Sequence, residues 1–256
     1  METKRNLKYF TSKGISPLMI VAFALMAVGV VLSAFKSARL IGIIVLVGGF
    51  FLAIYAGGGK SSGDDIEYQV GERMRNMHER GMIRFELFEK SLKFLQPLTL
   101  RGYEFNDEVY YKKGSDGAHR TSVFSAAILF FTGERIQIHR KRFSFVNEEI
   151  DEELGGSYKY IDLDHTEIRE RIFERQVGKR LVKIRVYDFV LIGMDGTEVL
   201  NMTVDYGADI DKACDDINRI INVRKKAYAE KVARVEADRK ARLEAAAAEA
   251  AAAQNA

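Results

Sequence analysis

The chain has 256 residues, of which 47% are hydrophobic and 29% charged, as in an ordinary globular protein. Its net charge of +3, without a Lys/Arg stripe interleaved with aromatic residues, argues against a nucleic-acid partner. The single cysteine, Cys214, excludes an internal disulfide and fits a reducing compartment. Charge is unevenly distributed, because residues 18–35 and 40–56 carry none while the remainder is charge-rich.

The two uncharged runs predict a transmembrane helical hairpin over residues 16–57. They contain 18 and 17 residues, at the short end of the roughly 20 that cross a bilayer core. Neither run has the polar stripe of a soluble surface helix, so two buried helices of a soluble core are the weaker alternative. A cleaved signal peptide is disfavoured because the second run follows closely and no A-x-A cleavage site precedes it.

The distribution of positive charge predicts the orientation of this hairpin. Residues 1–15 form a basic tail, and cations recur over residues 60–84, whereas the short turn carries only Lys36 and Arg39. Segments rich in Lys and Arg stay on the cytoplasmic side. We therefore expect a multi-pass protein of the inner, cytoplasmic membrane with both termini in the cytoplasm and the turn outside.

Small residues recur at four-residue spacing within both apolar runs. Gly29 and Ser33 lie in the first run, and Gly49 and Ala53 lie in the second. This spacing lets helix backbones approach each other closely. We interpret these four as packing residues within the hairpin rather than as a dedicated dimer motif.

Residues 58–97 predict a polar linker followed by an amphipathic helix. The linker is rich in Gly, Ser and Asp. Apolar residues then recur every three or four positions over 66–96, with a weak point at Gly81 and an end at Pro97. Such a helix either packs against the rest of the protein, which is the commoner outcome, or lies on the lipid surface.

From residue 103 to residue 205 the periodicity becomes that of strands. An acidic stretch at 147–156 predicts a loop, and Met194-Asp195-Gly196 predicts a tight hairpin turn. A helical period returns after Gly207. The expected strands are 108–111, 121–131, 135–140, 158–163, 167–173, 181–191 and 198–204.

This order predicts an α+β fold in which a bent antiparallel sheet or barrel over residues 98–225 is capped by a C-terminal helix. Residues 226–256 are rich in Ala, Glu and Arg, which favour helix, and predict an exposed helical tail.

Residues 109–223 resemble a bacterial pleckstrin-homology (PH)-type domain. The run LFFTGERIQIHR at 129–140 is similar to the strand–turn–strand of that family, and YKYIDLDHTEI at 158–168 is similar to the strand leading into its I-x-x-I step. The Asp-Gly hairpin followed by a helix completes the resemblance, from which the acidic insertion at 148–153 departs. The resemblance implies about seven strands closed by a helix, and binding or assembly modules, often fused to membrane helices, rather than enzymes.

One cluster stands out as a candidate site, formed by Arg135, His139, Arg140, Lys141 and Arg142. Near a membrane such a patch attracts anionic head groups by about 1 kcal/mol per cation. The alternative is an ordinary charged, solvent-facing side of a strand.

Other chemistry has little support in the sequence. The four histidines do not lie at metal-ligand spacing, so we expect no metal, and no motif indicates a cofactor. Cys214 lies among apolar helix positions and is predicted to be a core residue. No nucleophile–base pair is visible, so we expect no enzymatic activity.

These features predict a non-enzymatic, membrane-anchored scaffold whose cytoplasmic PH-like domain binds proteins in a membrane or envelope assembly, such as a secretion or transfer system. The expected partners are the lipid bilayer, other membrane or envelope proteins and a second copy of the chain, with no nucleic acid. Two alternatives stay open: a membrane sensor that binds anionic lipid, and an accessory subunit of an uncharacterised enzyme.

Overall fold

The computed structural model describes residues 2–12, 17–57, 60–92 and 95–254, with side chains described as far as residue 244. The chain forms two compact units. Unit 1 comprises residues 1–75, 103–124 and 142–152, and unit 2 comprises residues 76–102, 125–141 and 153–256. This division differs from the predicted single domain over 98–225. The predictions for Lys13 of the basic tail and Gly58 of the linker lie outside the described residues.

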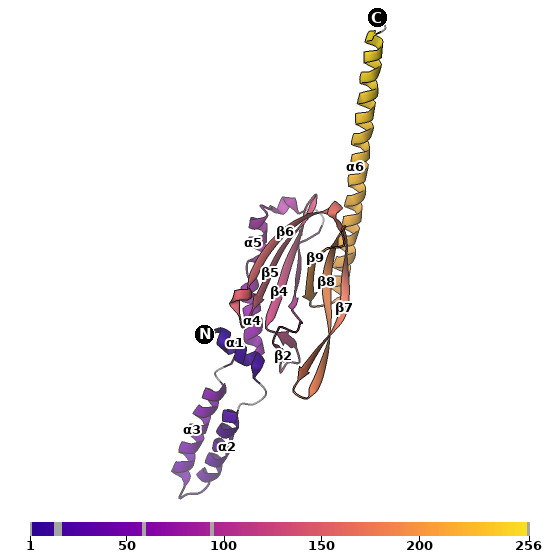
Figure 1. The fold of residues 1–256 in the computed structure, drawn as a ribbon. Helices are drawn as coiled ribbons and strands as arrows, with labels where there is room; N and C mark the ends of the chain where they lie inside the picture. The colour runs from indigo at the N-terminus through magenta and orange to yellow at the C-terminus, as the bar shows by residue number, and fades with distance from the viewer. Residues whose placement is uncertain (1, 13–16, 58–59, 93–94, 255–256) are drawn as a thin grey trace. The chain divides into compact units, whose positions relative to one another are not determined.

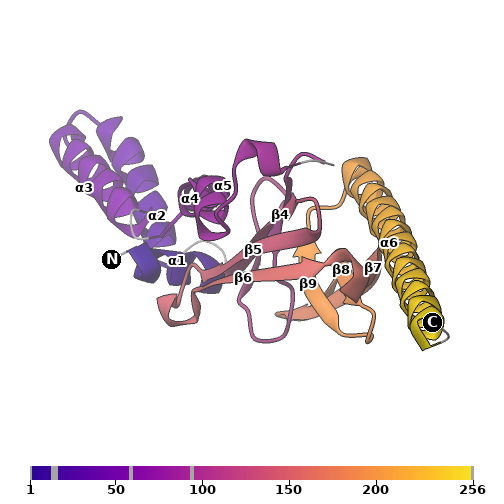
Figure 2. The ribbon, with the colours of Figure 1, turned by 90° about the horizontal axis from the view of Figure 1, so that it is seen from above.

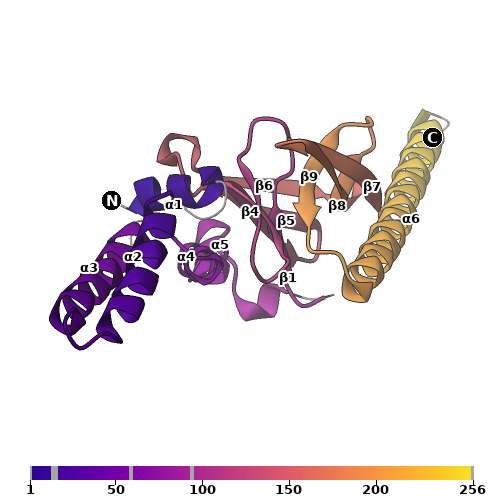
Figure 3. The same ribbon diagram turned by 90° about the horizontal axis from the view of Figure 1, so that it is seen from below.

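Unit 1 begins with α1 (Glu2–Thr11), where the sequence predicted only a basic tail. Tyr9 and Phe10 are buried, so this segment is amphipathic despite its charge. Two apolar helices follow, α2 (Pro17–Ser33) and α3 (Arg39–Gly57), joined by the turn at 34–38. They lie antiparallel and side by side (Figures 1, 2 and 3).

The helix α4 (Gly63–Met74) completes the helical part of unit 1. Ser62 caps it through a capping box, in which the Ser62 hydroxyl accepts from Asp65 N and the Asp65 carboxylate accepts from Ser62 N. These bonds lower the pKa of Asp65. The single helix predicted over 66–96 is wrong, because α4 ends at Met74 and Asn76 adopts a left-handed conformation with φ of 60°.

The rest of unit 1 is built around an aromatic cluster. Neighbouring rings of Tyr103, Phe124, Phe143 and Phe145 lie 5.0–5.5 Å apart, and Phe10 of α1 lies 6.2 Å from Phe145. Such ring spacings are those of favourable edge-to-face and offset-stacked pairs. Beside this cluster in sequence, β2 (Tyr111–Lys113) and β3 (His119–Thr121) form a short antiparallel hairpin.

Two sheets provide most of the remaining structure. The first has the order β1-β4-β5-β6, and the second is an antiparallel sheet of order β7-β8-β9. In the first sheet, β4 begins in unit 1 and continues in unit 2 from Ser125, and β5 begins in unit 2 and continues in unit 1 from Arg142. The bounds are β1 (Leu98–Tyr103), β4 (Val123–Phe131), β5 (Arg135–Ser144), β6 (Glu152–Lys159), β7 (Leu163–Val177), β8 (Arg180–Gly193) and β9 (Glu198–Val204).

Several predicted strand bounds need correction. The sequence missed β1, and the acidic loop predicted over 147–156 is wrong from Glu152 onward, where β6 begins after the short helix η2 (Glu148–Ile150). The strand predicted over 158–163 contains the 3-10 turn η3 (Tyr160–Asp162). The Asp-Gly turn is confirmed, because Gly196 has φ of +80° and joins β8 to β9.

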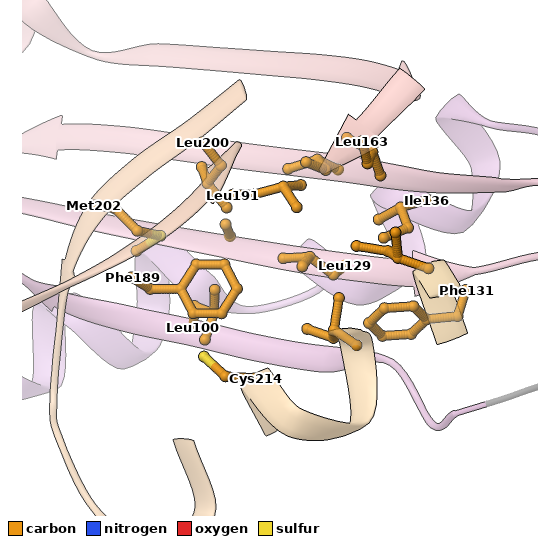
Figure 4. Packing of buried hydrophobic residues seen from close by; sticks show 14 of the residues in the cluster. Leu100, Leu129, Phe131, Ile136, Leu163, Phe189, Leu191, Leu200, Met202 and Cys214 are labelled. Carbon is orange, nitrogen blue, oxygen red and sulfur yellow. The ribbon is translucent and has the colours of Figure 1, made fainter. Parts of the chain in front are cut away.

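The helix α6 (Ala208–Gln254) closes a hydrophobic core that both sheets share. In Figure 4 Leu129, Phe131 and Ile136 face side chains from the second sheet, with Cys214 below them on the helix. Of the predicted fold class, the α+β composition, the antiparallel sheets and the C-terminal helix are therefore confirmed. From residue 226 to Gln254 the chain continues as helix, in agreement with the predicted tail.

Polar contacts fix α6 against β7. The Asn218 side chain accepts from Thr166 N at 2.6 Å and donates to Thr166 O at 2.9 Å, so it pairs with the strand as a neighbouring backbone would. The Thr166 hydroxyl donates to the carbonyl of Cys214 at 3.2 Å. These bonds satisfy backbone groups of β7 that have no further strand to pair with.

Candidate membrane anchor and its polar base

The side chains of α2 and α3 form an apolar surface that is largely exposed. Ile20, Val31, Ile44 and Phe51 each expose 60–65% of their area. Large exposed apolar surfaces mark membrane or protein contacts. Among the described helices, α3 alone is both long and apolar enough to cross a membrane, whereas α2 is apolar but has 17 residues.

Glycine backbones bring the two apolar helices into direct contact. A Cβ on Gly42 would lie 2.4 Å from the Ser33 nitrogen, and a Cβ on Gly29 would lie 2.5 Å from the Leu46 nitrogen. A Cβ on Gly49 would meet Met26 at 2.9 Å. The structure therefore brings Gly29, Ser33 and Gly49 of the predicted packing set to this interface.

The predicted set was incomplete at this interface. Ala53 is half-buried, and it is not among the nearest neighbours of the three glycines that face the other helix. The spacing argument also missed Gly42, since its packing partner Gly29 lies on the other helix. Spacing within one helix indicates a small-residue face but not which position meets the partner helix.

A buried polar network, called the polar base below, consists of Asn6, Ser61, Gln69 and the Phe145 carbonyl and joins the chain segments on either side of the hairpin. The Asn6 amide donates to Gln69 Oε1 at 2.8 Å and to Phe145 O at 3.0 Å. Its Oδ1 accepts from Ser61 Oγ at 2.6 Å and from Gln69 Nε2 at 3.1 Å. Asn6, Ser61 and Gln69 are all buried. Because α2 and α3 lie between residues 6 and 61, this network holds together the chain segment before the hairpin and the chain segment after it.

A lysine from β2 stabilises the end of α1 beside this network. Lys112 Nζ donates to Tyr9 O at 2.5 Å and to Ser12 Oγ at 3.1 Å, and it lies 4.6 Å from the centre of the Tyr9 ring. A cation at this position satisfies carbonyls that a helix C-terminus leaves unpaired. Burial lowers the pKa of the Lys112 ammonium.

Arg120 forms a second buried junction in unit 1. Its guanidinium donates to both carboxylate oxygens of Asp116 at 3.0 and 2.7 Å and to Glu67 Oε1 at 2.7 Å. The Tyr103 hydroxyl donates to the same Glu67 oxygen at 2.9 Å. Hydrogen bonds from Arg120 lower the pKa of Asp116 to about 2. The pairing compensates the burial of the guanidinium and ties α4 to the β2–β3 hairpin.

The predicted basic cluster does not form one set of free cations. Arg142 belongs to unit 1 and makes a bidentate contact with Glu104, with bonds of 2.9–3.0 Å. Arg135 and Lys141 belong to unit 2, and Arg135 is exposed. Arg140 is half-buried, and among the described residues its Nε has no hydrogen-bond partner.

The expectation that His139 faces solvent is wrong, because its side chain is only 1% exposed. The helix α5 (Met77–Arg84) covers it, and a Cβ on Gly81 would lie 3.2 Å from His139 Cβ. Gly81 is therefore a close-packing position inside α5 rather than the predicted break. His139 Nε2 lies 3.1 Å from Glu153 Oε1 without hydrogen-bond geometry.

We expect the stability of the protein to fall as the pH drops below about 6.5, in part because of His139. Burial lowers its pKa from 6.5; Glu153 raises it, and Arg84 and Arg80 lower it further. The unfolded chain therefore binds this proton at a higher pH than the folded chain, so stability is full above 6.5 and is lost below it. Thermal unfolding of His139→Leu should depend less on pH than that of the wild type between about pH 7.5 and 5.5.

A wild-type and a His139→Leu protein with parallel pH profiles would contradict the prediction.

The prediction that Cys214 is a core residue is confirmed, because its thiol lies in the hydrophobic cluster and burial raises its pKa. Within the described part of the chain, no three His, Cys, Asp or Glu side chains are arranged to hold a metal ion. Comparisons with protein families, curated proteins and solved structures found no match to this chain. Functional inference therefore depends on the geometry of the apolar hairpin and its polar base.

Proposed function

We propose that this chain is a non-enzymatic, membrane-anchored scaffold whose α2 and α3 cross the inner membrane and hold the rest of the chain at its cytoplasmic face. The observation that carries the proposal is the bond between Ser61 and Asn6 at 2.6 Å. Two residues in hydrogen-bond contact lie on the same side of a membrane. The chain between them therefore crosses an even number of times, and if α3 crosses, a second crossing is required.

The helix α2 is the described segment suited to that second crossing. Its 17 residues rise about 26 Å and the 19 residues of α3 about 29 Å, against a hydrocarbon core of about 30 Å. Local thinning of the bilayer accommodates a slightly short span at a modest cost. The cations of α1 and of residues 60–84 favour the cytoplasmic side for both ends.

The scaffold part of the proposal is supported by the order of the strands. Apart from the β2–β3 hairpin, consecutive strands are neighbours in each sheet, and α6 follows β9 directly. A four-stranded sheet followed by a three-stranded sheet and a helix is consistent with the PH-type resemblance. That resemblance implies protein binding rather than catalysis.

Arginine substitutions in α3 provide the test of anchoring. We expect the wild type to stay with membranes after alkaline carbonate extraction, and Ile44→Arg/Val47→Arg to be released or degraded. Both positions are exposed on α3, and two arginines at the centre of a span cost roughly 6 kcal/mol. Release of the wild type by carbonate would overturn the anchor.

The matched control is Val223→Arg/Val235→Arg, since both valines are exposed on α6. This variant should remain with the membrane. For orientation, a membrane-impermeant maleimide applied to spheroplasts should label Ser37→Cys in the turn but not Tyr228→Cys on α6, and the reverse pattern would contradict the proposed sidedness.

Purification from detergent-solubilised membranes tests the scaffold role separately. We expect membrane proteins to co-purify with the chain in near-stoichiometric amounts. A chain that remains anchored but is recovered alone after cross-linking in cells would contradict the scaffold role and leave the anchor intact.

A further inference from the structure

The strands β7 and β8 continue as a two-stranded ribbon after β9 ends. Strand β9 pairs with β8 only between Tyr187 and Ile192, whereas β7 and β8 remain paired as far as Val177 and Arg180. Residues 171–186 therefore form a ribbon about 20 Å long without a third strand, visible beyond the end of β9 in Figure 1. Gly178, with φ of +65°, forms its tight turn.

This ribbon concentrates positive charge. Residues 171–186 contain six Arg or Lys and one Glu, which leaves a net charge of +5, whereas the whole chain has only +3. Glu174 pairs with Lys183 at 2.5 Å, and Arg185 pairs with Glu170 at 3.0 Å. Lys179 and Arg180 lie at the turn, and no ion pair is recorded for either among the described residues.

The same ribbon exposes three aliphatic side chains among these cations. Ile172, Leu181 and Val177 are 62%, 52% and 47% exposed. Leu181 lies opposite Gln176 and Ile172 lies opposite Arg185, so the strand register puts Ile172 and Leu181 on one face, whereas Val177 lies on the other face beside the turn. Aliphatic side chains flanked by Lys and Arg are typical of surfaces that lie at a membrane interface.

We propose that the ribbon of residues 171–186 contacts an anionic lipid surface, with its cations at the head groups and its aliphatic side chains among the upper acyl chains. The charge complementarity identifies the partner as anionic, and the aliphatic side chains favour lipid over nucleic acid. A single-stranded nucleic acid would instead require exposed aromatic rings for base stacking, and the ribbon exposes aliphatic side chains. The inference rests on the proposed function in one respect, because the anchor attaches the chain to a bilayer.

The test uses the full chain reconstituted in lipid nanodiscs with a fluorophore on Val177→Cys. Cys214 is buried and its thiol pKa is raised, so the introduced thiol is the reactive one. The matched control is Val223→Cys, an exposed valine on α6. Quenching by lipids that carry a spin label near the head group is measured in neutral phosphatidylcholine and after addition of anionic phosphatidylglycerol.

We expect stronger quenching at residue 177 than at residue 223, and only with the anionic lipid. Lys179→Glu/Arg180→Glu should reduce that quenching about threefold or more, because each cation near an anionic surface adds to the attraction. Arg239→Glu/Lys240→Glu, an adjacent exposed pair on α6, should have no effect.

Equal quenching at residues 177 and 223 would overturn the inference, and so would a fluorescence change caused by duplex DNA or by a soluble protein instead of lipid. Co-elution of the chain with nanodiscs reports the anchor independently. Failure of the ribbon contact is therefore distinguishable from failure of the proposed function.

Discussion

Replacing Gly42 with leucine is expected to separate α2 from α3 and to lower the free energy of unfolding of the hairpin by about 3 kcal/mol or more. The new Cβ would lie 2.4 Å from the backbone nitrogen of Ser33. A backbone atom within a helix cannot rotate away as a side chain does, so the two helices must move apart and lose their contacts. Unfolding in mixtures of SDS and mild detergent, followed by circular dichroism, measures the loss.

Gly48→Leu is the matched control, because a Cβ built on Gly48 would meet nothing within 4 Å beyond the adjoining backbone of its own helix. This variant adds the same side chain to the same helix, and we expect no loss of stability, since leucine favours a helix over glycine by up to about 1 kcal/mol. Equal losses for the two variants would show that the added leucine acts through lipid contact and not through helix packing.

Replacing Asn6 with alanine is expected to destabilise unit 1 by roughly 3–5 kcal/mol, because it leaves several buried polar groups without partners. Ser61 Oγ, both amide atoms of Gln69 and the Phe145 carbonyl all bond to Asn6. We expect much faster amide hydrogen exchange in α4, which carries Gln69, measured by mass spectrometry on the full chain in detergent.

Asn201→Ala supplies the comparison, since Asn201 is exposed and its amide makes one side-chain bond, to Glu198. It should leave the exchange of α4 unchanged. If Asn6→Ala behaves in the same way, the polar base does not hold the ends of the hairpin together, and the even-crossing argument loses its support.

The predictable elements are those specified by local patterns. The apolar runs predicted α2 and α3 because neither run has a polar stripe, and the Asp-Gly pair predicted the β8–β9 turn. The core positions of α6, including Cys214, followed from helical spacing alone. In contrast, β6 was hidden because its sequence is acidic and contains Gly155 and Gly156, which suggest a loop. The end of α4 depends on one left-handed residue, Asn76, which no strong helix breaker precedes.

The polar base was not predictable for a different reason. Its members Asn6, Ser61 and Gln69 lie 55 and 63 positions apart, and nothing in the neighbouring residues of each indicates the others. His139 likewise fits the alternation of an exposed strand face, and only the tertiary packing of α5 covers it. Burial that a distant element imposes leaves no periodic signal in the sequence.

The discontinuous composition of unit 1 affects the order of events during synthesis. Asn6 bonds to the carbonyl of Phe145, so α1 cannot reach its final partners until residue 145 has left the ribosome. At ordinary rates of translation this interval is on the order of ten seconds. The apolar hairpin is synthesised well within that time and can enter the bilayer while α1 still lacks its final partners. Closure of the base around residues 6, 61, 69 and 145 is consequently a late step of maturation, and a ribosome-stalled chain ending before β5 should still show fast exchange in α1.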